Sequence, residues 1–162
     1  MKLVFDQSGT ITARTASPLT DGASATLICN EDYAKKNNLN ILGKIISTAV
    51  HGCPPELMGL GPIEASRKAL KRANLTIDDI DVVEINEAFA SQSLACIKDL
   101  NINPEIVNID GGAIALGHPL GATGVRITTK AAQILKRKNQ KYALATQCIG
   151  LGQGIATIIE NS

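Results

Sequence analysis

The sequence GGAIALGHPLGATG, Gly111–Gly124, places one histidine, His118, in a loop that holds five glycines. A pattern typical of a long helix follows directly. Glycines let the backbone approach a ligand closely, and the N-terminus of a helix favours an anion or a developing oxyanion. A second glycine loop, CIGLGQG (Cys148–Gly154), begins with a cysteine at the end of an expected strand. Because α/β sheets place ligands beyond the carboxyl ends of their strands, both loops are candidate site loops.

Composition narrows the class of protein. The chain has 162 residues, of which 44% are hydrophobic and 19% charged, as expected for one globular domain. Sixteen basic against fifteen acidic residues, with 2% aromatics, argue against nucleic-acid binding. No apolar run is long enough to span a membrane, and the start turns polar too early for a signal peptide. Four scattered cysteines without a C-x-x-C pair predict free thiols in the cytoplasm and no metal site.

Strand and helix patterns alternate along the chain. This order, β-α-β-α-β-α-β-β, predicts an α/β fold with a five-stranded, largely parallel sheet, covered by helices on both faces and ending in a hairpin. The first forty residues contain a helix but too little to complete a domain. The expected strands cover residues 43–52, 80–86, 104–110, 142–148 and 155–160. The expected helices cover residues 20–37 (as one helix or as two short ones in tandem), 62–74, 87–100 and 121–139.

His118 and Cys148 each have an ordinary structural interpretation, as a hydrogen-bonded loop residue and as a small buried hydrophobe. Asn86, however, ends another apolar run in the same way, at the start of NEAFA. In a parallel sheet the three side chains can converge on one crevice. An imidazole N–H can donate to an enolate or thioester oxygen, and an amide can orient a water for the same task. A thiol with a lowered pKa can carry a proton between carbon and sulfur.

Three motifs in order, NEAFA, GGAIALGHPLGATG and CIGLGQG, resemble those of the thiolases, which are acyl-CoA:acetyl-CoA C-acyltransferases. The resemblance runs from GTITARTASPLTDGASA (Gly9–Ala25) through MGLGPIEASRKAL to GIATIIE, nearly the whole chain. It implies the C-terminal half of a thiolase, with a mixed sheet between helices. Residues 41–162 then form the C-terminal domain, and residues 1–40 resemble the end of the N-terminal domain.

The resemblance also implies roles for four residues in reversible Claisen condensation and thiolytic cleavage of acetoacetyl-CoA or 3-ketoacyl-CoA. His118 donates to the thioester oxygen and helps to activate the nucleophile. Asn86 holds the water that completes this oxyanion hole. Cys148 is the acid/base at the α-carbon, and the backbone N–H of Gly150 is the donor of a second oxyanion hole.

Three further positions, Ser17, Ala88 and Phe89, match residues that line the pantetheine arm of coenzyme A in the family. For Phe89, plain core packing is an equally good interpretation. Coenzyme A and acyl-CoA are substrates here, and no permanently bound cofactor is implied. Leu151 and Gln153 differ from the glycine and methionine common in the family, which leaves the preferred acyl chain length open.

The thiolase nucleophile is a cysteine of the N-terminal half in a C-x-S-G context, and Cys29, Cys53 and Cys96 do not fit that context. Covalent catalysis needs this group for its first step. We therefore expect the chain to be inactive alone, to require a thiolase N-terminal half, and to form a homo-oligomer. The alternative is a non-catalytic module that binds acyl-CoA or drives oligomerisation. A phosphate-binding nucleotide loop is excluded, since neither of its glycine patterns occurs.

Overall fold

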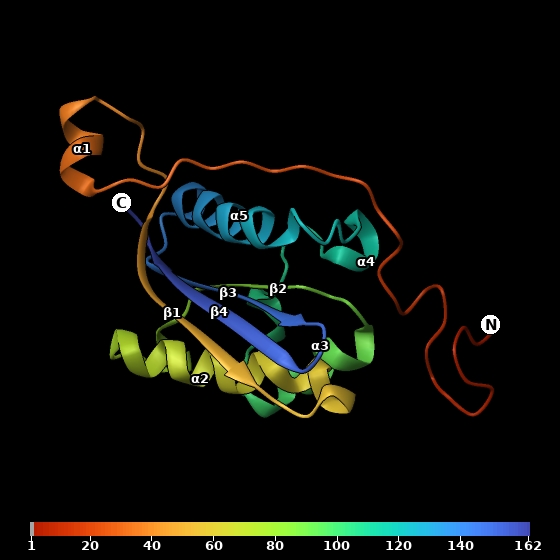
Figure 1. Ribbon diagram of the computed structural model, residues 1–162. Coiled ribbons are helices and arrows are strands. Elements are labelled where there is room, and N and C mark those ends of the chain that lie inside the picture. The colour runs from red at the N-terminus through yellow and green to blue at the C-terminus, as the bar shows by residue number, and fades with distance from the viewer. Residues whose placement is uncertain (1) are drawn as a thin grey trace.

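The computed structural model describes residues 2–162, which form a sheet between two layers of helices (Figure 1). Helices α4 and α5 cover one face of the sheet, and α2 and α3 cover the other. Among the described residues, no helix has the length and apolarity that crossing a bilayer would take. The strands are β1 (Lys44–Gly52), β2 (Val82–Ile85), β3 (Tyr142–Ile149) and β4 (Gln153–Glu160), and the helices are α1 (Glu31–Lys36), α2 (Gly61–Ala73), α3 (Ala90–Asp99), α4 (Ala113–Leu116) and α5 (Thr123–Lys138).

The strand order is β1-β4-β3-β2, with β2 and β3 parallel and the other two pairs antiparallel. The expectation of a largely parallel sheet is therefore wrong, although the terminal hairpin is confirmed. After β3 the chain reverses in a tight turn at Gly150–Gly152 and inserts β4 between β3 and β1. Strands β1, β2 and β3 still run in one direction, so their carboxyl ends lie at one edge of the sheet.

The sheet has four strands rather than the expected five. Residues 104–110 form a 3-10 turn at Pro104–Ile106 and then a single parallel bridge between Val107 and Val83. Beyond the bridge the side chain of Asn108 replaces a strand: its Nδ2 donates to the Ile85 carbonyl at 2.9 Å, and its Oδ1 accepts from the Ile85 N–H at 2.9 Å. One amide side chain thus satisfies the edge of β2, which is why a regular fifth strand does not form.

The core consists of two clusters, one on each face of the sheet. Residues of β2 alternate between them: Val83 and Ile85 pack toward α2 and α3, whereas Val82 packs toward α5. Each fully buried aliphatic side chain contributes about 1.5–3 kcal/mol of transfer free energy. The backbones of α2 and β4 meet directly, because a Cβ on Gly154 would lie 2.1 Å from the carbonyl carbon of Gly61. This contact brings α2 close to the edge where β4 begins.

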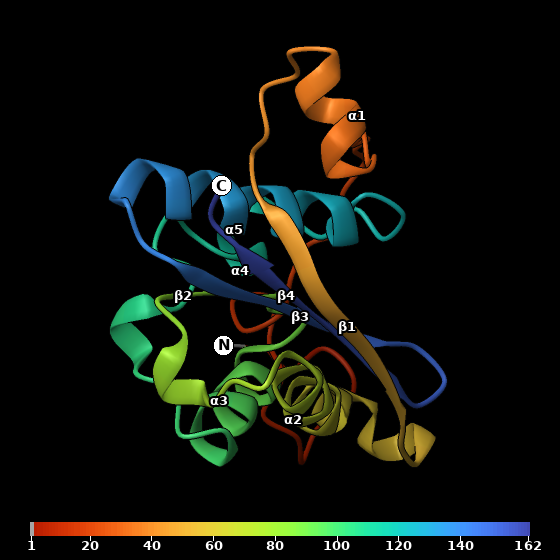
Figure 2. The same cartoon turned by 90° about the vertical axis from the view of Figure 1, so that its left-hand side faces the viewer.

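The N-terminal segment differs most from the sequence-based expectation. Only Glu31–Lys36 of the helix expected over residues 20–37 is helical, and the side chain of Asn30 caps its first turn. After a turn at residues 13–15, residues 17–29 form an extended strap that runs along α4 and α5 (Figures 1 and 2). Every residue from 21 to 30 is exposed, so a helix over these residues would bury no apolar face against this chain.

Candidate active site

The carboxyl ends of β2 and β3 bring Asn86 and Cys148 to one edge of the sheet. Asn86 directly follows β2, and its backbone N–H donates to the Thr146 carbonyl of β3 at 3.0 Å. Ile85 pairs with Thr146 in the parallel register, and Cys148 lies two residues further along β3. The sequence predicted that each side chain follows the carboxyl end of a strand, which the structure shows, and the structure adds that the two strands are parallel neighbours.

Asn86 is completely buried, yet neither its Oδ1 nor its Nδ2 has a hydrogen-bond partner among the described residues. A buried polar group without a partner destabilises a protein by about 1–3 kcal/mol, so native structures rarely leave one. The Asn86 amide, with both polar atoms lacking a partner within residues 2–162, can therefore hold a bound water or a ligand atom at the end of β2.

Cys148 is half-buried, and the pKa of its thiol is raised above the ordinary value of 9.0, mainly by burial. The neighbouring Cys53 thiol raises it further. Cys53 is held at this edge by its backbone N–H, which donates to the Gly152 carbonyl at 2.8 Å. A lowered pKa is thus the wrong expectation. At neutral pH Cys148 is a thiol that can give up a proton.

His118 lies half-buried in the loop between α4 and α5. Its Nδ1 is 2.8 Å from the Thr123 Oγ1, and its backbone N–H donates to the Thr20 Oγ1 of the strap at 3.3 Å. Burial, and secondarily the charge of Arg126, lower the pKa of the ring below 6.5. The imidazole is therefore neutral at physiological pH.

Glu87 connects the Asn86 segment to the His118 loop. One carboxylate oxygen accepts from the Asn108 Nδ2 at 2.7 Å, and the other accepts from the Ile114 N–H at 3.1 Å. The carboxylate lies so close to Gly112 that a Cβ there would be 2.1 Å from the Glu87 Cδ. A side chain at this position would displace the Glu87 carboxylate from its two hydrogen bonds, so the glycine lets the two motifs contact one another directly.

The three residues expected to line the pantetheine arm lie side by side. The Ser17 N–H donates to the Ala88 carbonyl at 3.0 Å, next to an antiparallel bridge between Ala16 and Phe89. Phe89 is half-buried, and its ring meets that of Phe5 edge-on with centroids 6.3 Å apart. Gly150 is exposed in the β3–β4 turn, two residues beyond Cys148.

Sequence reasoning missed the side chains that support these residues, which are Thr20, Glu87, Asn108 and Thr123. Glu87 and Thr123 lie inside the quoted motifs, where a carboxylate beside the asparagine and a hydroxyl five residues after the histidine were available signals. Asn108 has a φ of 45°, a conformation that asparagine tolerates better than most residues. Their partners are distant in the sequence, so spacing alone does not identify them.

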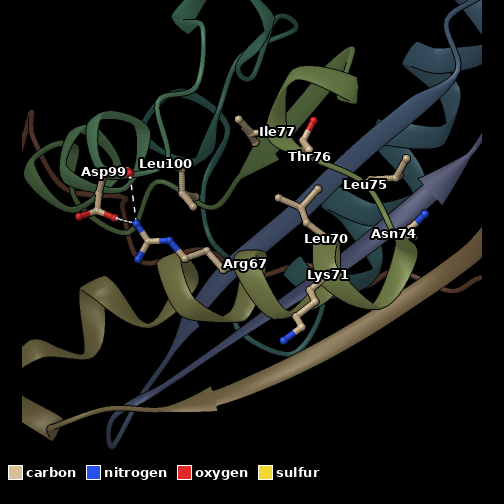
Figure 3. A pocket seen from close by; sticks show the side chains of 9 residues that line it. All are labelled: Arg67, Leu70, Lys71, Asn74, Leu75, Thr76, Ile77, Asp99 and Leu100. Atoms are coloured by element: carbon tan, nitrogen blue, oxygen red, sulfur yellow. Dashed lines mark hydrogen bonds and ion pairs between the residues drawn. The ribbon is translucent and has the colours of Figure 1, made fainter.

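Two hollows lie away from this edge. A groove of about 510 Å³ beside α2 has Leu70, Leu75 and Leu100 among its lining residues, and neither a histidine nor a cysteine (Figure 3). Arg67 spans its rim and pairs with Asp99 at 2.5 Å. A larger hollow of about 890 Å³ lies under the strap, where Ala132 of α5 and Ile159 of β4 contribute to its wall. Neither hollow contains the predicted catalytic side chains.

Comparison with known proteins agrees with this geometry. Residues 39–161 of the sequence match the family model of the thiolase C-terminal domain, and residues 1–32 match that of the thiolase N-terminal domain. The chain belongs to the thiolase family.

Its relatives include a 3-ketoacyl-CoA thiolase of Vibrio parahaemolyticus, which is 56% identical over 99% of this chain and 42% of its own length. The chain thus spans about two fifths of the curated relatives it matches. The crystal structure of human mitochondrial 3-ketoacyl-CoA thiolase is similar at 46% identity and a TM-score of 0.91, covering 99% of this chain and 41% of that one. A Bacillus anthracis acetyl-CoA acetyltransferase superposes with a TM-score of 0.95 at 42% identity, over 98% and 40% of the two chains.

Proposed function

We propose that this chain forms the acid/base and oxyanion half of a 3-ketoacyl-CoA thiolase. The observation that carries the proposal is the buried, unpartnered amide of Asn86 beside the strand that bears Cys148. The reaction is reversible cleavage of a 3-ketoacyl-CoA by coenzyme A to acetyl-CoA and a shortened acyl-CoA. Several relatives are 3-ketoacyl-CoA thiolases, and one similar crystal structure is that of the human mitochondrial 3-ketoacyl-CoA thiolase in complex with CoA.

Cleavage of the substrate takes place between its 3-keto carbon and its α-carbon. A nucleophilic cysteine thiolate of the N-terminal half attacks the 3-keto carbon, and the bond between that carbon and the α-carbon breaks. The acyl group stays on the nucleophile as a thioester, while the electron pair remains on the α-carbon as the enolate of acetyl-CoA. The enolate then takes a proton from Cys148. Coenzyme A next attacks the acyl thioester: its thiol proton returns to Cys148, the acyl group forms a bond to the CoA sulfur, and the nucleophilic cysteine leaves as a thiolate. Because burial raises the pKa of Cys148, the thiol carries this proton at neutral pH.

The developing enolate oxygen needs hydrogen-bond donors, and we assign these to His118 and to a water held by Asn86. The Glu87 carboxylate fixes the spacing between the two segments through Asn108 and Ile114. Preorganised donors of this kind contribute about 3–4 kcal/mol each to transition-state stabilisation. We assign the second oxyanion hole, which serves the acylated nucleophile, to the backbone N–H of Gly150.

Coenzyme A is placed as a substrate, with its pantetheine arm along Ser17, Ala88 and Phe89. These residues come from the strap and the start of α3, and the hydrogen bond between Ser17 and Ala88 couples the two segments. The strap therefore contributes to substrate binding.

We further propose that the chain is inactive until a thiolase N-terminal half joins it, with the division between the two domains near residue 40. The match of residues 1–32 to the N-terminal domain supports this division. The strap is then part of the N-terminal domain, and the rest of that domain covers α5 and fills the hollow beneath the strap. Exposed side chains outside the strap, such as Leu120 and Leu151, support a homo-oligomeric whole protein. Free thiols support a location in the cytoplasm.

A chimera tests the function. The part of the Vibrio parahaemolyticus relative that precedes its match to this chain is fused to Met1, and thiolysis of a 3-ketoacyl-CoA is measured. We expect activity from the chimera, none from the chain alone, and a fall of about 10²–10⁴ for Cys148→Ala. Cys29→Ala, at an exposed cysteine of the strap, is the control and keeps full activity. Thiolysis by the chain alone, or an active Cys148→Ala chimera, overturns the proposal.

A further inference from the structure

Thr123 is the first residue of α5 and is completely buried beside His118. Its Oγ1 makes two short contacts: 2.8 Å to the His118 Nδ1 and 2.9 Å to the Pro119 carbonyl oxygen. The same carbonyl also accepts the backbone N–H groups of Ala122 and Thr123, both at 2.9 Å. The hydroxyl is therefore held between one ring nitrogen and one oxygen.

A threonine hydroxyl has a single proton, so only one of these contacts can be donated by Thr123. The Pro119 oxygen carries no hydrogen and can only accept. If the hydroxyl donated to the ring instead, two oxygens would face each other at 2.9 Å with no hydrogen between them. The hydroxyl proton therefore points to Pro119, and the lone pairs of the hydroxyl oxygen face the imidazole. Under this arrangement the His118 Nδ1 carries a hydrogen and donates it to Thr123.

We propose that Thr123 is a positioning residue that holds His118 in the Nδ1–H tautomer and leaves Nε2 as the only basic nitrogen of the ring. Free histidine prefers the opposite tautomer, so the protein must impose this one. The hydrogen bond between the His118 backbone N–H and Thr20 holds the loop backbone in place from the other side.

The tautomer determines the direction of proton transfer. With Nε2 unprotonated, the neutral ring can take the proton of a nucleophilic thiol: the S–H bond breaks, an N–H bond forms at Nε2, and a thiolate remains. Only then does Nε2 carry a hydrogen that it can donate to an oxyanion. This consequence rests on the proposed function, whereas the tautomer itself does not. Burial also favours a neutral ring before the transfer.

Nuclear magnetic resonance of the ¹⁵N-labelled imidazoles tests the proposal on the chain as it exists, without any activity. The chain has two histidines, and the variant His118→Ala identifies the signals of His118 against those of His51. We expect the wild-type spectrum at pH 7.5 to show a protonated Nδ1 and an unprotonated Nε2. A wild-type ring in the Nε2–H form overturns the proposal.

Two variants of similar size separate the hydroxyl from packing. Thr123→Ser keeps the hydroxyl and is expected to keep the Nδ1–H form. Thr123→Val keeps the volume and is expected to shift the ratio of tautomers about tenfold toward Nε2–H, the change that one neutral hydrogen bond produces. An unchanged tautomer in a folded Thr123→Val variant overturns the proposal. If Thr123→Val does not fold, the spectra of the wild type and Thr123→Ser decide the question.

Discussion

Burial controls the ionisation of Glu84, a carboxylate in β2 that is 1% exposed. Desolvation raises its pKa from 4.5 to about 7, although the charges of Arg126 and Lys130 oppose the shift. One carboxylate oxygen has no hydrogen-bond partner among residues 2–162. The folded state thus prefers the neutral acid, whereas the unfolded chain ionises near pH 4.5.

Glu84→Gln is expected to remove a pH-dependent loss of stability. The contribution of neutral Glu84 is fully present below pH 4.5 and is lost as pH rises to about 7, because in that range the unfolded chain ionises while the folded state keeps the proton. At pH 8 the variant should be more stable by up to about 3 kcal/mol. Urea unfolding from pH 4 to 8 measures the difference. His118 titrates with the opposite sign but is common to both proteins. An equal difference at every pH contradicts the assignment.

At the residue scale, the sequence identified the candidate catalytic residues but not their ionisation or their hydrogen-bond partners. Asn86 and Cys148 were recognisable because polar residues follow apolar strands. The direction of the pKa shift of Cys148 could not be predicted from the sequence, since it depends on burial in the folded structure. The contacts of Glu87 and Thr123 depend on loop geometry that spacing does not encode. The catalytic roles of these residues remain predictions.

The contact between α2 and β4 depends on Gly154. Its missing side chain lets the two backbones touch, so Gly154→Ala must displace either α2 or the start of β4. We expect a loss of about 1–3 kcal/mol in the free energy of unfolding, measured from the urea midpoint. Gly121→Ala is the control, because a Cβ at that exposed glycine meets open space. Equal stability of the two variants contradicts the packing described.

The edge of β2 depends on the side chain of Asn108. Asn108→Gly keeps the positive φ but removes the bonds to both backbone groups of Ile85 and to Glu87. Leaving buried groups without partners should lower the stability by about 2–3 kcal/mol. Asn101→Gly is the matched control: its φ is 54°, and its exposed side chain makes no hydrogen bond with the described residues. Similar urea midpoints for the two variants refute this role.

Elements with strong apolar periodicity were predictable. The expected helix over residues 62–74 and the strand over residues 43–52 agree closely with α2 and β1. The fifth strand was not predictable, because an asparagine side chain replaces it at the edge of β2. The strap was missed because helix propensity is weak where no partner face exists in the same chain.

At the scale of the whole molecule, the strap falls within the match to the thiolase N-terminal domain, whereas the helices beside it fall within the match to the C-terminal domain. In the structure the strap lies along α4 and α5 and is hydrogen-bonded to the NEAFA loop, although its sequence matches the N-terminal domain. Limited proteolysis of the chain alone should cut first between residues 17 and 30, where nearly every side chain is exposed. In the chimera these sites should be cut about tenfold more slowly if the N-terminal half covers them. First cuts within the β3–β4 hairpin contradict this arrangement.

Exchange of the α-hydrogens of acetyl-CoA with D₂O most directly tests whether Cys148 and Asn86 act on the α-carbon of a thioester. The chimera is incubated with acetyl-CoA in D₂O, and deuterium in the acetyl methyl group is measured by mass spectrometry. We predict incorporation that falls by about 10²–10⁴ for Cys148→Ala and by about 10²–10³ for Asn86→Ala, but not for Cys29→Ala. Undiminished incorporation by the Cys148→Ala chimera contradicts the account.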